Sequence, residues 1–278
     1  MKIKTSKGDR TFQVINILIF AIFAIICAYP FYYLIINSIS ANDLSASGKV
    51  NFLPHGFQLE NYVKVFQLNG LGTAAMVSLG RTVIGTICTV LASVYLGFMF
   101  TQQRMWHRKL WYRFMVITMY FNAGLIPMYM TMKTLHLTNS FWVYIIPAIV
   151  QPFNIIMAKT YVESIPPALQ EAAEIDGCSR GKIFFTIMLP LIKPATFSVA
   201  LIVFINAWNE YLYPYYILQK PSKYTLVLLI RQFFGGADSA QNMHGAAAAA
   251  VLCVLPLIVA YLCLQKYFIQ GQVDSAVK

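Results

Sequence analysis

The run FQVINILIFAIFAIICAYPFYYLII at residues 12–36 decides the fold class of this chain. A bilayer core about 30 Å thick is crossed by about 20 predominantly apolar residues in a helix, and this run is long enough. Its 25 residues also exceed the apolar core of about 7 to 15 residues in a secretory signal peptide. The run is therefore predicted to remain in the protein as a membrane-spanning helix.

The composition of the whole chain agrees with a membrane protein. Of 278 residues, 58% are hydrophobic and 11% are charged, whereas ordinary globular proteins have about 25% charged residues. So few charges cannot cover a water-facing surface, which excludes a soluble domain and a disordered chain. The net charge of +11 is interpreted as a signal of membrane orientation, and no nucleic-acid partner is expected.

Five further apolar windows make this an all-α, polytopic membrane protein with a single domain over residues 1–278. The six candidate spans are residues 12–36, 74–100, 111–132, 141–160, 196–218 and 245–268. Six spans put both termini on one side of the membrane. That side then has 14 Lys and Arg residues and the other has 7, so the termini are predicted to be cytoplasmic. The two halves show no internal repeat, which weighs against an inverted-repeat secondary transporter.

The predicted inner loop at residues 161–195 is the most structured polar stretch. Residues 164–177 favour a short helix, because proline fits its first turn, Ala, Leu, Gln and Glu follow, and Gly177 supplies a left-handed stop. One side of this helix is small and apolar. A second helix is expected from the N-cap Ser179 to about Leu189, with Pro190 and Pro194 ending it. The loop alone is compatible with a solvated connector or with a helix that seats in a groove of another protein.

The same loop has a specific resemblance. The run Glu171-Ala172-Ala173-x-x-Asp176-Gly177, with Phe184, Leu189-Pro190-Leu191 and Pro194 after it, closely resembles the EAA loop of bacterial ABC importer permeases. Other segments are similar to carbohydrate-importer permeases of the maltose-permease type: Phe52-Leu53-Pro54, Phe57, Leu59-Glu60-Asn61-Tyr62, Trp208-Asn209-Glu210 and Gln265-Lys266-Tyr267-Phe268.

The resemblance implies a multi-pass subunit in a bacterial cytoplasmic membrane, in contact with membrane lipid. It implies a partner permease in a heterodimer, two ATPase subunits, an extracytoplasmic solute-binding protein, and a sugar or oligosaccharide as substrate. The EAA helix is then a coupling helix that contacts an ATPase. Small side chains permit close approach and a carboxylate can pair with a basic group. The residues assigned to this contact are Glu171, Ala172, Ala173, Asp176 and Gly177.

Several kinds of chemistry are excluded by what the sequence lacks. The phosphate-binding pattern GxxxxGK[ST] is absent, so ATP and Mg are expected on partner subunits and no cofactor on this chain. The four His residues are far apart and the five Cys residues form no CxxC pair. Neither a metal site nor a catalytic site is therefore predicted.

One polar stripe lies in the predicted fifth span, residues 196–218. Asn206, Asn209, Glu210 and Tyr213 recur at helical spacings of 3, 4 and 7. Polar groups at membrane depth usually face a bundle interior or a wet cavity, so the stripe is a candidate wall of the substrate path. The alternative is hydrogen bonding between helices, with Glu210 reaching outward to the membrane surface.

The third and fourth candidate spans are expected to be interrupted, since one contains Gly124 and Pro127 and the other contains Pro152. Interrupted backbone at membrane depth is tolerated where it is buried in protein or lines a cavity. Side chains near the interruptions could hydrogen-bond or stack on a neutral, hydroxyl-rich solute. They are Asn122, Tyr129, Gln151 and Asn154.

Arg81, in the second candidate span, needs a partner or a path to lipid headgroups. Two rival functions remain open. An importer of this family could carry another polar solute, and an ion-coupled carrier or channel would use Glu210 or Arg81 as its coupling charge.

Overall fold

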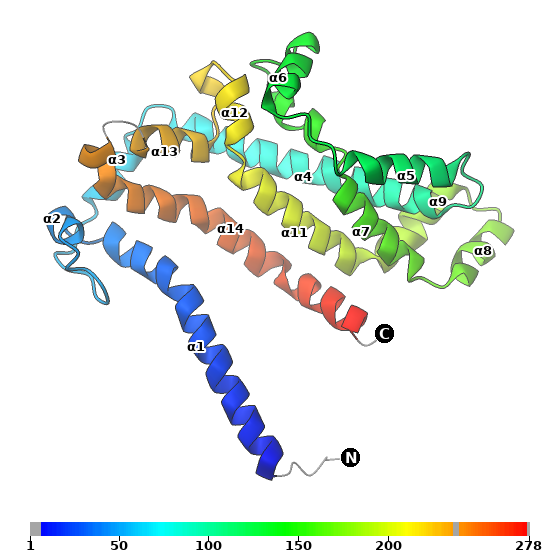
Figure 1. Ribbon diagram of the computed structural model, residues 1–278, viewed down its shortest axis with the longest axis horizontal. Coiled ribbons are helices and arrows are strands. Elements are labelled where there is room, and N and C mark those ends of the chain that lie inside the picture. The colour runs from blue at the N-terminus through cyan, green and yellow to red at the C-terminus, as the bar shows by residue number, and fades with distance from the viewer. Residues whose placement is uncertain (1–6, 236–238, 277–278) are drawn as a thin grey trace. The chain divides into compact units, whose positions relative to one another are not determined.

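The computed structural model describes residues 7–235 and 239–276, and every regular element within these ranges is a helix (Figure 1). The chain divides into two compact units. The first contains the residues up to 68 together with 233–252, and the second contains 69–232 together with the residues from 253 onward. Helix α14, Ser239–Ala276, contributes to both units. The all-helical prediction is confirmed at this level.

The first unit is organised around the end of one long apolar helix, α1 (Lys7–Ser38), followed by α2 (Asn42–Ala46) and α3 (Glu60–Phe66). Hydrogen bonds fold the connecting loop onto the end of α1. The Tyr29 hydroxyl donates to the Asn51 carbonyl at 3.1 Å, and the Ser38 and Tyr62 hydroxyls lie 2.8 Å apart. The loop is therefore an ordered extension of the helix.

The second unit contains the long helix α4 (Leu71–Thr101) and a series of shorter elements. They are α5 (Arg108–Thr118), α6 (Leu125–Thr134), η1 (Phe141–Tyr144), η2 (Ile146–Ala148), α7 (Pro152–Glu163), α8 (Pro167–Ile175), α9 (Arg180–Ile183), η3 (Phe184–Met188), α10 (Leu189–Leu191), α11 (Lys193–Asn209), α12 (Leu212–Ile217), η4 (Pro221–Lys223) and α13 (Leu226–Phe234).

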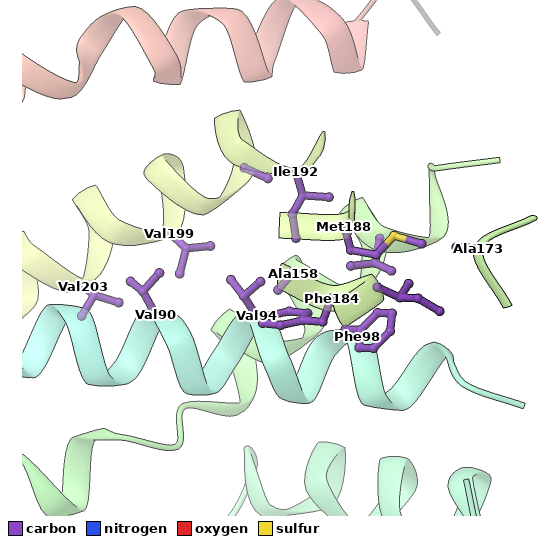
Figure 2. Close-up of a cluster of buried hydrophobic side chains, with 13 residues drawn as sticks. Val90, Val94, Phe98, Ala158, Ala173, Phe184, Met188, Ile192, Val199 and Val203 are labelled. Atoms are coloured by element: carbon purple, nitrogen blue, oxygen red, sulfur yellow. The ribbon is translucent and has the colours of Figure 1, made fainter. Parts of the chain in front are cut away.

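The core of the second unit lies where α4, α7, α11 and η3 pack together. Figure 2 shows Val94 and Phe98 of α4 beside Phe184 of η3, with Val199 of α11 on another side. Gly97 permits the close approach of α4 and α7. A Cβ atom at this position would lie 2.8 Å from the Lys159 nitrogen and 3.0 Å from the Ala158 Cβ atom.

Both expected interruptions are present. The window 111–132 is divided between α5 and α6, and the elements on either side of residues 149–151 are bent by 47°. At the first break, Gly124 has a φ of +83°, and its N–H donates to Asn122 Oδ1 at 2.9 Å. At the second break, Pro152 begins α7, where a missing N–H costs no helical hydrogen bond.

The prediction of one continuous helix over residues 196–218 is wrong. Helix α11 ends at Asn209 and α12 begins at Leu212. The physical reason is Pro214, whose ring would clash with the carbonyl of residue 210 in a continuous helix. Glu210 instead adopts an extended conformation, with φ −67° and ψ 116°. The four stripe residues therefore do not share one helical face.

The loop at residues 161–195 is largely as predicted. Helix α8 is followed by Gly177 with a φ of +75°, and Ser179 Oγ accepts the Lys182 N–H. The prediction that Pro190 ends the second helix is wrong, since Pro190 lies inside α10. The π-helical turn η3 just before it breaks the regular hydrogen-bond pattern that would exclude proline. The chain then bends by 82° into α11.

Three helices in the described part of the chain are long and apolar enough to cross a membrane: residues 8–38, 71–101 and 245–266. Two bent pairs raise the number to five if each pair is one span. The structure thus supports a multi-pass membrane protein by helix length and composition.

Candidate functional site

A polar cavity of about 360 Å³ lies among the broken helices of the second unit. Four residues predicted from the sequence line it: Gln151, Asn154, Asn206 and Glu210. Asn154 is 6% exposed. Apolar side chains such as Val143, Val203 and Ile217 form much of the remaining wall. A few polar groups set in a largely apolar wall suit a ligand that must be oriented by a few hydrogen bonds.

Arg81 is the charged group most deeply placed in the cavity wall, with 5% exposure. Its guanidinium donates through Nη1 to the Glu210 carbonyl at 2.9 Å and through Nη2 to the Ala207 carbonyl. It also lies over the Tyr144 ring, 4.6 Å from the centroid. The carbonyls at the end of α11 lack helical partners, and a cation at a helix C-terminus is stabilised by the helix dipole. Arg81 therefore stabilises the break in the predicted fifth span.

Helix α4 also bonds to the far end of residues 210–226, the segment that follows the break. Ser78 lies one turn before Arg81, and its Oγ accepts the Leu226 N–H at 2.7 Å. Between these anchors, the Tyr144 hydroxyl donates to the Lys223 carbonyl at 2.6 Å. Residues 210–226 are thus attached to α4 and η1 by polar side chains bonded to backbone groups.

Glu210 bonds within its own segment. Its Oε1 accepts the Leu212 N–H at 2.9 Å, which satisfies the first N–H group of α12, and the carboxylate attracts the Arg81 guanidinium electrostatically. The cavity thus contains a positive and a negative group close together, and its polar character is not that of a simple anion or cation site.

Three of the remaining predicted path residues do not line the cavity. Asn122 is exposed and caps the break before α6, while Tyr129 packs with Met132. Asn209 is exposed and does not line the cavity. The side chain of Tyr213 lies outside the described residues. Of the stripe residues, Asn206 and Glu210 line the cavity and Asn209 does not, because the helix breaks within the stripe.

A second, apolar groove of about 700 Å³ runs between α7, α8 and the start of α11. Met157, Leu169 and Ile192 are among its lining residues. Phe153 lines both the polar cavity and the apolar groove, and is half exposed. Sequence reasoning did not single out Phe153, because a lone Phe in an apolar helix has no distinguishing pattern.

The predicted coupling residues divide between two faces of α8. Ala173 is buried in the cluster that contains Ile183 and Phe184, whereas Glu171, Ala172 and Asp176 are exposed. Ile175 is 85% exposed on this outer side, and was not predicted as a contact residue. The exposed face therefore combines carboxylates with one large apolar side chain, a combination suited to a protein partner.

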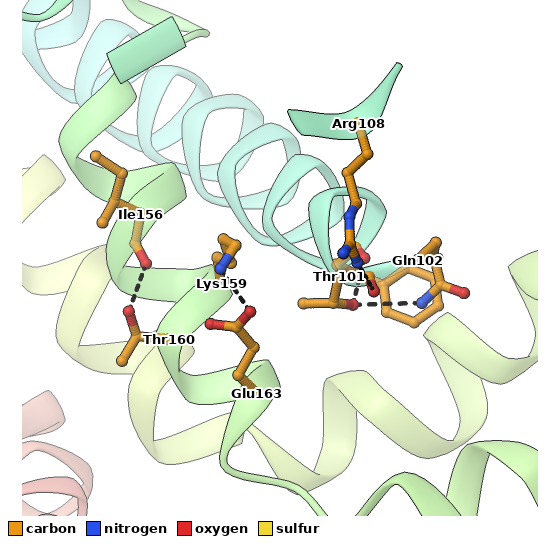
Figure 3. A network of polar contacts seen from close by, with 8 residues as sticks. Thr101, Gln102, Arg108, Ile156, Lys159, Thr160 and Glu163 are labelled. Carbon is orange, nitrogen blue, oxygen red and sulfur yellow. Dashed lines mark hydrogen bonds and ion pairs between the residues drawn. The ribbon is translucent and has the colours of Figure 1, made fainter. Parts of the chain in front are cut away.

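Polar contacts connect α8 with the end of α4. The amides of Gln102 and Gln170 exchange two hydrogen bonds, of 2.8 and 3.2 Å. Figure 3 shows the neighbouring contacts, in which Lys159 pairs with Glu163 at 2.5 Å and Arg108 donates to the Thr101 carbonyl.

Within residues 7–235 and 239–276, no group of three His, Cys, Asp or Glu side chains is placed to hold a metal ion.

Two relatives from Bacillus subtilis (strain 168) align with nearly the full chain. The polygalacturonan/rhamnogalacturonan transport system permease protein YtcP is 29% identical, over 97% of this chain and 99% of its own. Protein LplC is 30% identical, over 98% of this chain and 97% of its own.

The fold matches a chain from the crystal structure of a bacterial ABC transporter involved in the import of the acidic polysaccharide alginate. The TM-score is 0.79 and the identity 28%, over 96% of this chain and 100% of that chain. The family model for the binding-protein-dependent transport system inner membrane component matches residues 90–273, which include the whole EAA loop. This chain belongs to that family, which confirms its resemblance to the ABC importer permeases.

Proposed function

We propose that this chain is the permease subunit of an ATP-driven importer that moves a sugar or oligosaccharide across the bacterial cytoplasmic membrane. The family match over residues 90–273 is the observation that supports this most strongly. Relatives are named for transport of polygalacturonan, of arabinooligosaccharides and of melibiose, raffinose and stachyose. The chain performs no covalent chemistry itself, and ATP and Mg bind to partner ATPase subunits.

The proposed topology has six spans with both termini in the cytoplasm and one transmembrane domain over residues 1–278. It is supported by the excess of Lys and Arg on the predicted inner side, by three long apolar helices and by the bent pair at residues 141–163. The other two spans would be α11, which follows the cytoplasmic loop, and the pair α5 and α6, interrupted at residues 119–124. Such an interruption is tolerated where other helices or a cavity cover the freed backbone groups.

The proposed coupling element is α8. Its exposed residues Glu171 and Ala172, with Asp176 and Gly177 just after the helix, would contact an ATPase subunit. Ala173 faces inward and packs near Ile183. A push on the outer face of α8 would reach α4 and α7 through that cluster, because a packed apolar core deforms little.

The proposed path includes the polar cavity, with Gln151, Asn154, Asn206 and Glu210 as hydrogen-bonding groups for sugar hydroxyls. A second permease would complete the wall, and a solute-binding protein would deliver the substrate. A solved alginate transporter is described in complex with an alginate pentasaccharide-bound periplasmic protein, although at 16% identity it supports the fold alone. The proposed path also includes Asn122, Tyr129 and Asn209, which do not line the cavity, and Tyr213.

Transport by the purified importer tests this function. The complete complex in sealed vesicles should accumulate a labelled oligosaccharide with ATP, and should continue to do so after ionophores collapse the ion gradients. Uptake that ignores ATP and stops with the ionophores would instead establish the ion-coupled carrier. A panel of sugars and other polar solutes would distinguish carbohydrate import from import of another polar solute.

The substitution Glu171→Lys tests the coupling assignment. Charge reversal on the exposed face of α8 should place like charges against a basic group of the ATPase, and ATP-dependent uptake should fall at least tenfold. The exposed Asp43 in α2 offers a matched control, since Asp43→Lys makes the same charge change elsewhere. Full coupling in Glu171→Lys, with normal membrane insertion, would remove Glu171 from the contact.

A further inference from the structure

A basic cavity lies at the short turn between α4 and α5. Its volume is about 460 Å³. The residues that line it are Gln103, Met105, His107, Arg108, Lys109, Leu110 and Arg113. No acidic side chain contributes to this wall, so the cavity is positively charged.

The turn has a defined backbone structure. The Met105 N–H donates to the Gln102 carbonyl at 3.2 Å, and the Arg108 N–H donates to the Met105 carbonyl at 3.3 Å. His107 has a φ of +47°, which sharpens the reversal. Arg108 Nη1 also donates to the Thr101 carbonyl at 2.7 Å, as Figure 3 shows. The guanidinium is therefore fixed at the cavity rather than free in solvent.

The charge of the cavity is uncompensated within the described part of the chain. The ion pairs found there join Lys64 to Glu60 and Lys159 to Glu163. Neither pair includes Arg108, Lys109 or Arg113. Three cations around one cavity repel each other, so an anion bound among them would be stabilised.

The flanks of the cavity are apolar and exposed. Trp106 is 73% exposed, and Leu110, Trp111 and Phe114 are also exposed. The 31-residue helix α4 ends at Thr101, so these side chains lie where a membrane span meets water. Trp beside basic residues at the end of a span is the composition of a membrane interface.

We propose that this cavity binds the phosphate headgroup of an anionic phospholipid. The cations would bind the phosphate, and the exposed Trp and Leu side chains would contact the acyl region. An acidic soluble segment would satisfy the charges but leave these apolar side chains uncovered. Basic pockets at the ends of membrane helices are known to suit anionic headgroups.

Lipid binding at this turn would act on α8 as well. Gln102, at the start of the turn, is buried and exchanges two hydrogen bonds with Gln170 of α8. A headgroup that fixes the turn would fix this contact. Binding itself is independent of the transported solute, and only an effect on coupling rests on the proposed function.

Lipid retention by the purified importer tests the proposal. The complex would be placed in nanodiscs of phosphatidylcholine with increasing amounts of phosphatidylglycerol, and bound phosphatidylglycerol would be counted by native mass spectrometry. Lys109→Gln combined with Arg113→Gln removes two exposed charges and leaves the Arg108 contact intact. We expect phosphatidylglycerol affinity to fall about fivefold per charge, or about 25-fold in the double variant.

Two controls separate charge from structure. Lys109→Arg with Arg113→Lys preserves the charge and should bind phosphatidylglycerol as the parent does. Lys220→Gln with Lys223→Gln removes two charges elsewhere and should also have no effect. Unchanged phosphatidylglycerol retention in the double Gln variant would overturn the proposal. Loss of the ATPase subunit from that variant in phosphatidylcholine alone would also overturn it, by assigning the cavity to a protein partner.

Discussion

The two ends of the second unit are stabilised in different ways. Near the polar cavity, Arg81, Ser78 and Tyr144 bond to backbone groups of a segment that contains a helix break. Near α8, apolar side chains such as Phe98 and Phe184 interlock in a single cluster. At the first end the helix break frees backbone groups that need polar partners, whereas the second end, despite the π-helical turn η3, contains a large apolar cluster whose packing joins its helices. The structure of the first end should therefore depend on a few hydrogen bonds, and that of the second end on the close packing of its apolar core.

The largest expected effect comes from the apolar end. Phe184 is buried and contacts the rings of Tyr95 and Phe98, so Phe184→Ala should destabilise the folded protein by about 3 to 5 kcal/mol. The unfolding midpoint of the purified complex measures this. Phe185 is exposed beside it and provides the control Phe185→Ala, which should shift the midpoint much less. Equal shifts in the two variants would contradict the packing argument.

Arg81→Met tests the polar end, and its expected effect on folding is of the same order as that of Phe184→Ala. Two carbonyls at the end of α11 lose a charged donor, and each hydrogen bond to a charged group contributes about 1.5 to 3 kcal/mol. The rate of uptake should be reduced even under conditions in which the complex remains folded, because Asn206 and Glu210 lose their placement in the cavity. Arg81→Lys should restore part of the uptake, since an ammonium can still donate.

Arg231 supplies a comparison for the loss of an arginine. It also lies over an aromatic ring, that of Tyr211, at 4.2 Å, but it is exposed. Arg231→Met should therefore affect uptake less than Arg81→Met. Equal loss of uptake in both variants would show that the buried contacts of Arg81 have no special role.

Gly97→Ala should destabilise the folded protein least among these variants. The added methyl group would press against the backbone of α7, so we expect about 1 kcal/mol of destabilisation by overpacking. Gly72 is also in α4, but a Cβ atom there would meet nothing within 4 Å. Gly72→Ala should leave the unfolding midpoint unchanged or slightly raised, and a drop equal to that of Gly97→Ala would contradict the close-approach explanation.

The features that were predictable from the sequence depend on neighbouring residues. The limits of α8, the left-handed Gly177 and the cap at Ser179 follow from signals within a few positions of each helix end. The break before α12 also has a local cause, Pro214. It was missed because the polar spacing favoured a continuous helix, whereas the clash of a proline with the carbonyl four residues earlier is the stronger effect.

The placement of Arg81 could not be predicted in the same way. Its carbonyl partners are 126 and 129 residues away in the chain. A buried arginine indicates that partners exist, but hydropathy and spacing do not identify backbone carbonyls in another helix. The same limit applies to Phe153, which lies between the polar cavity and the apolar groove because several helices converge there.

The amide pair of Gln102 and Gln170 has a consequence for a cell whose internal conditions vary. Each side chain donates to the other, and neither gains nor loses a proton in the physiological range. An ion pair in this position would weaken as ionic strength rises or as a carboxylate becomes protonated. The two hydrogen bonds between the amides should therefore persist through acid stress and osmotic shock, and only the additional bond from Gln170 Nε2 to the Glu174 carboxylate, at 3.1 Å, depends on charge.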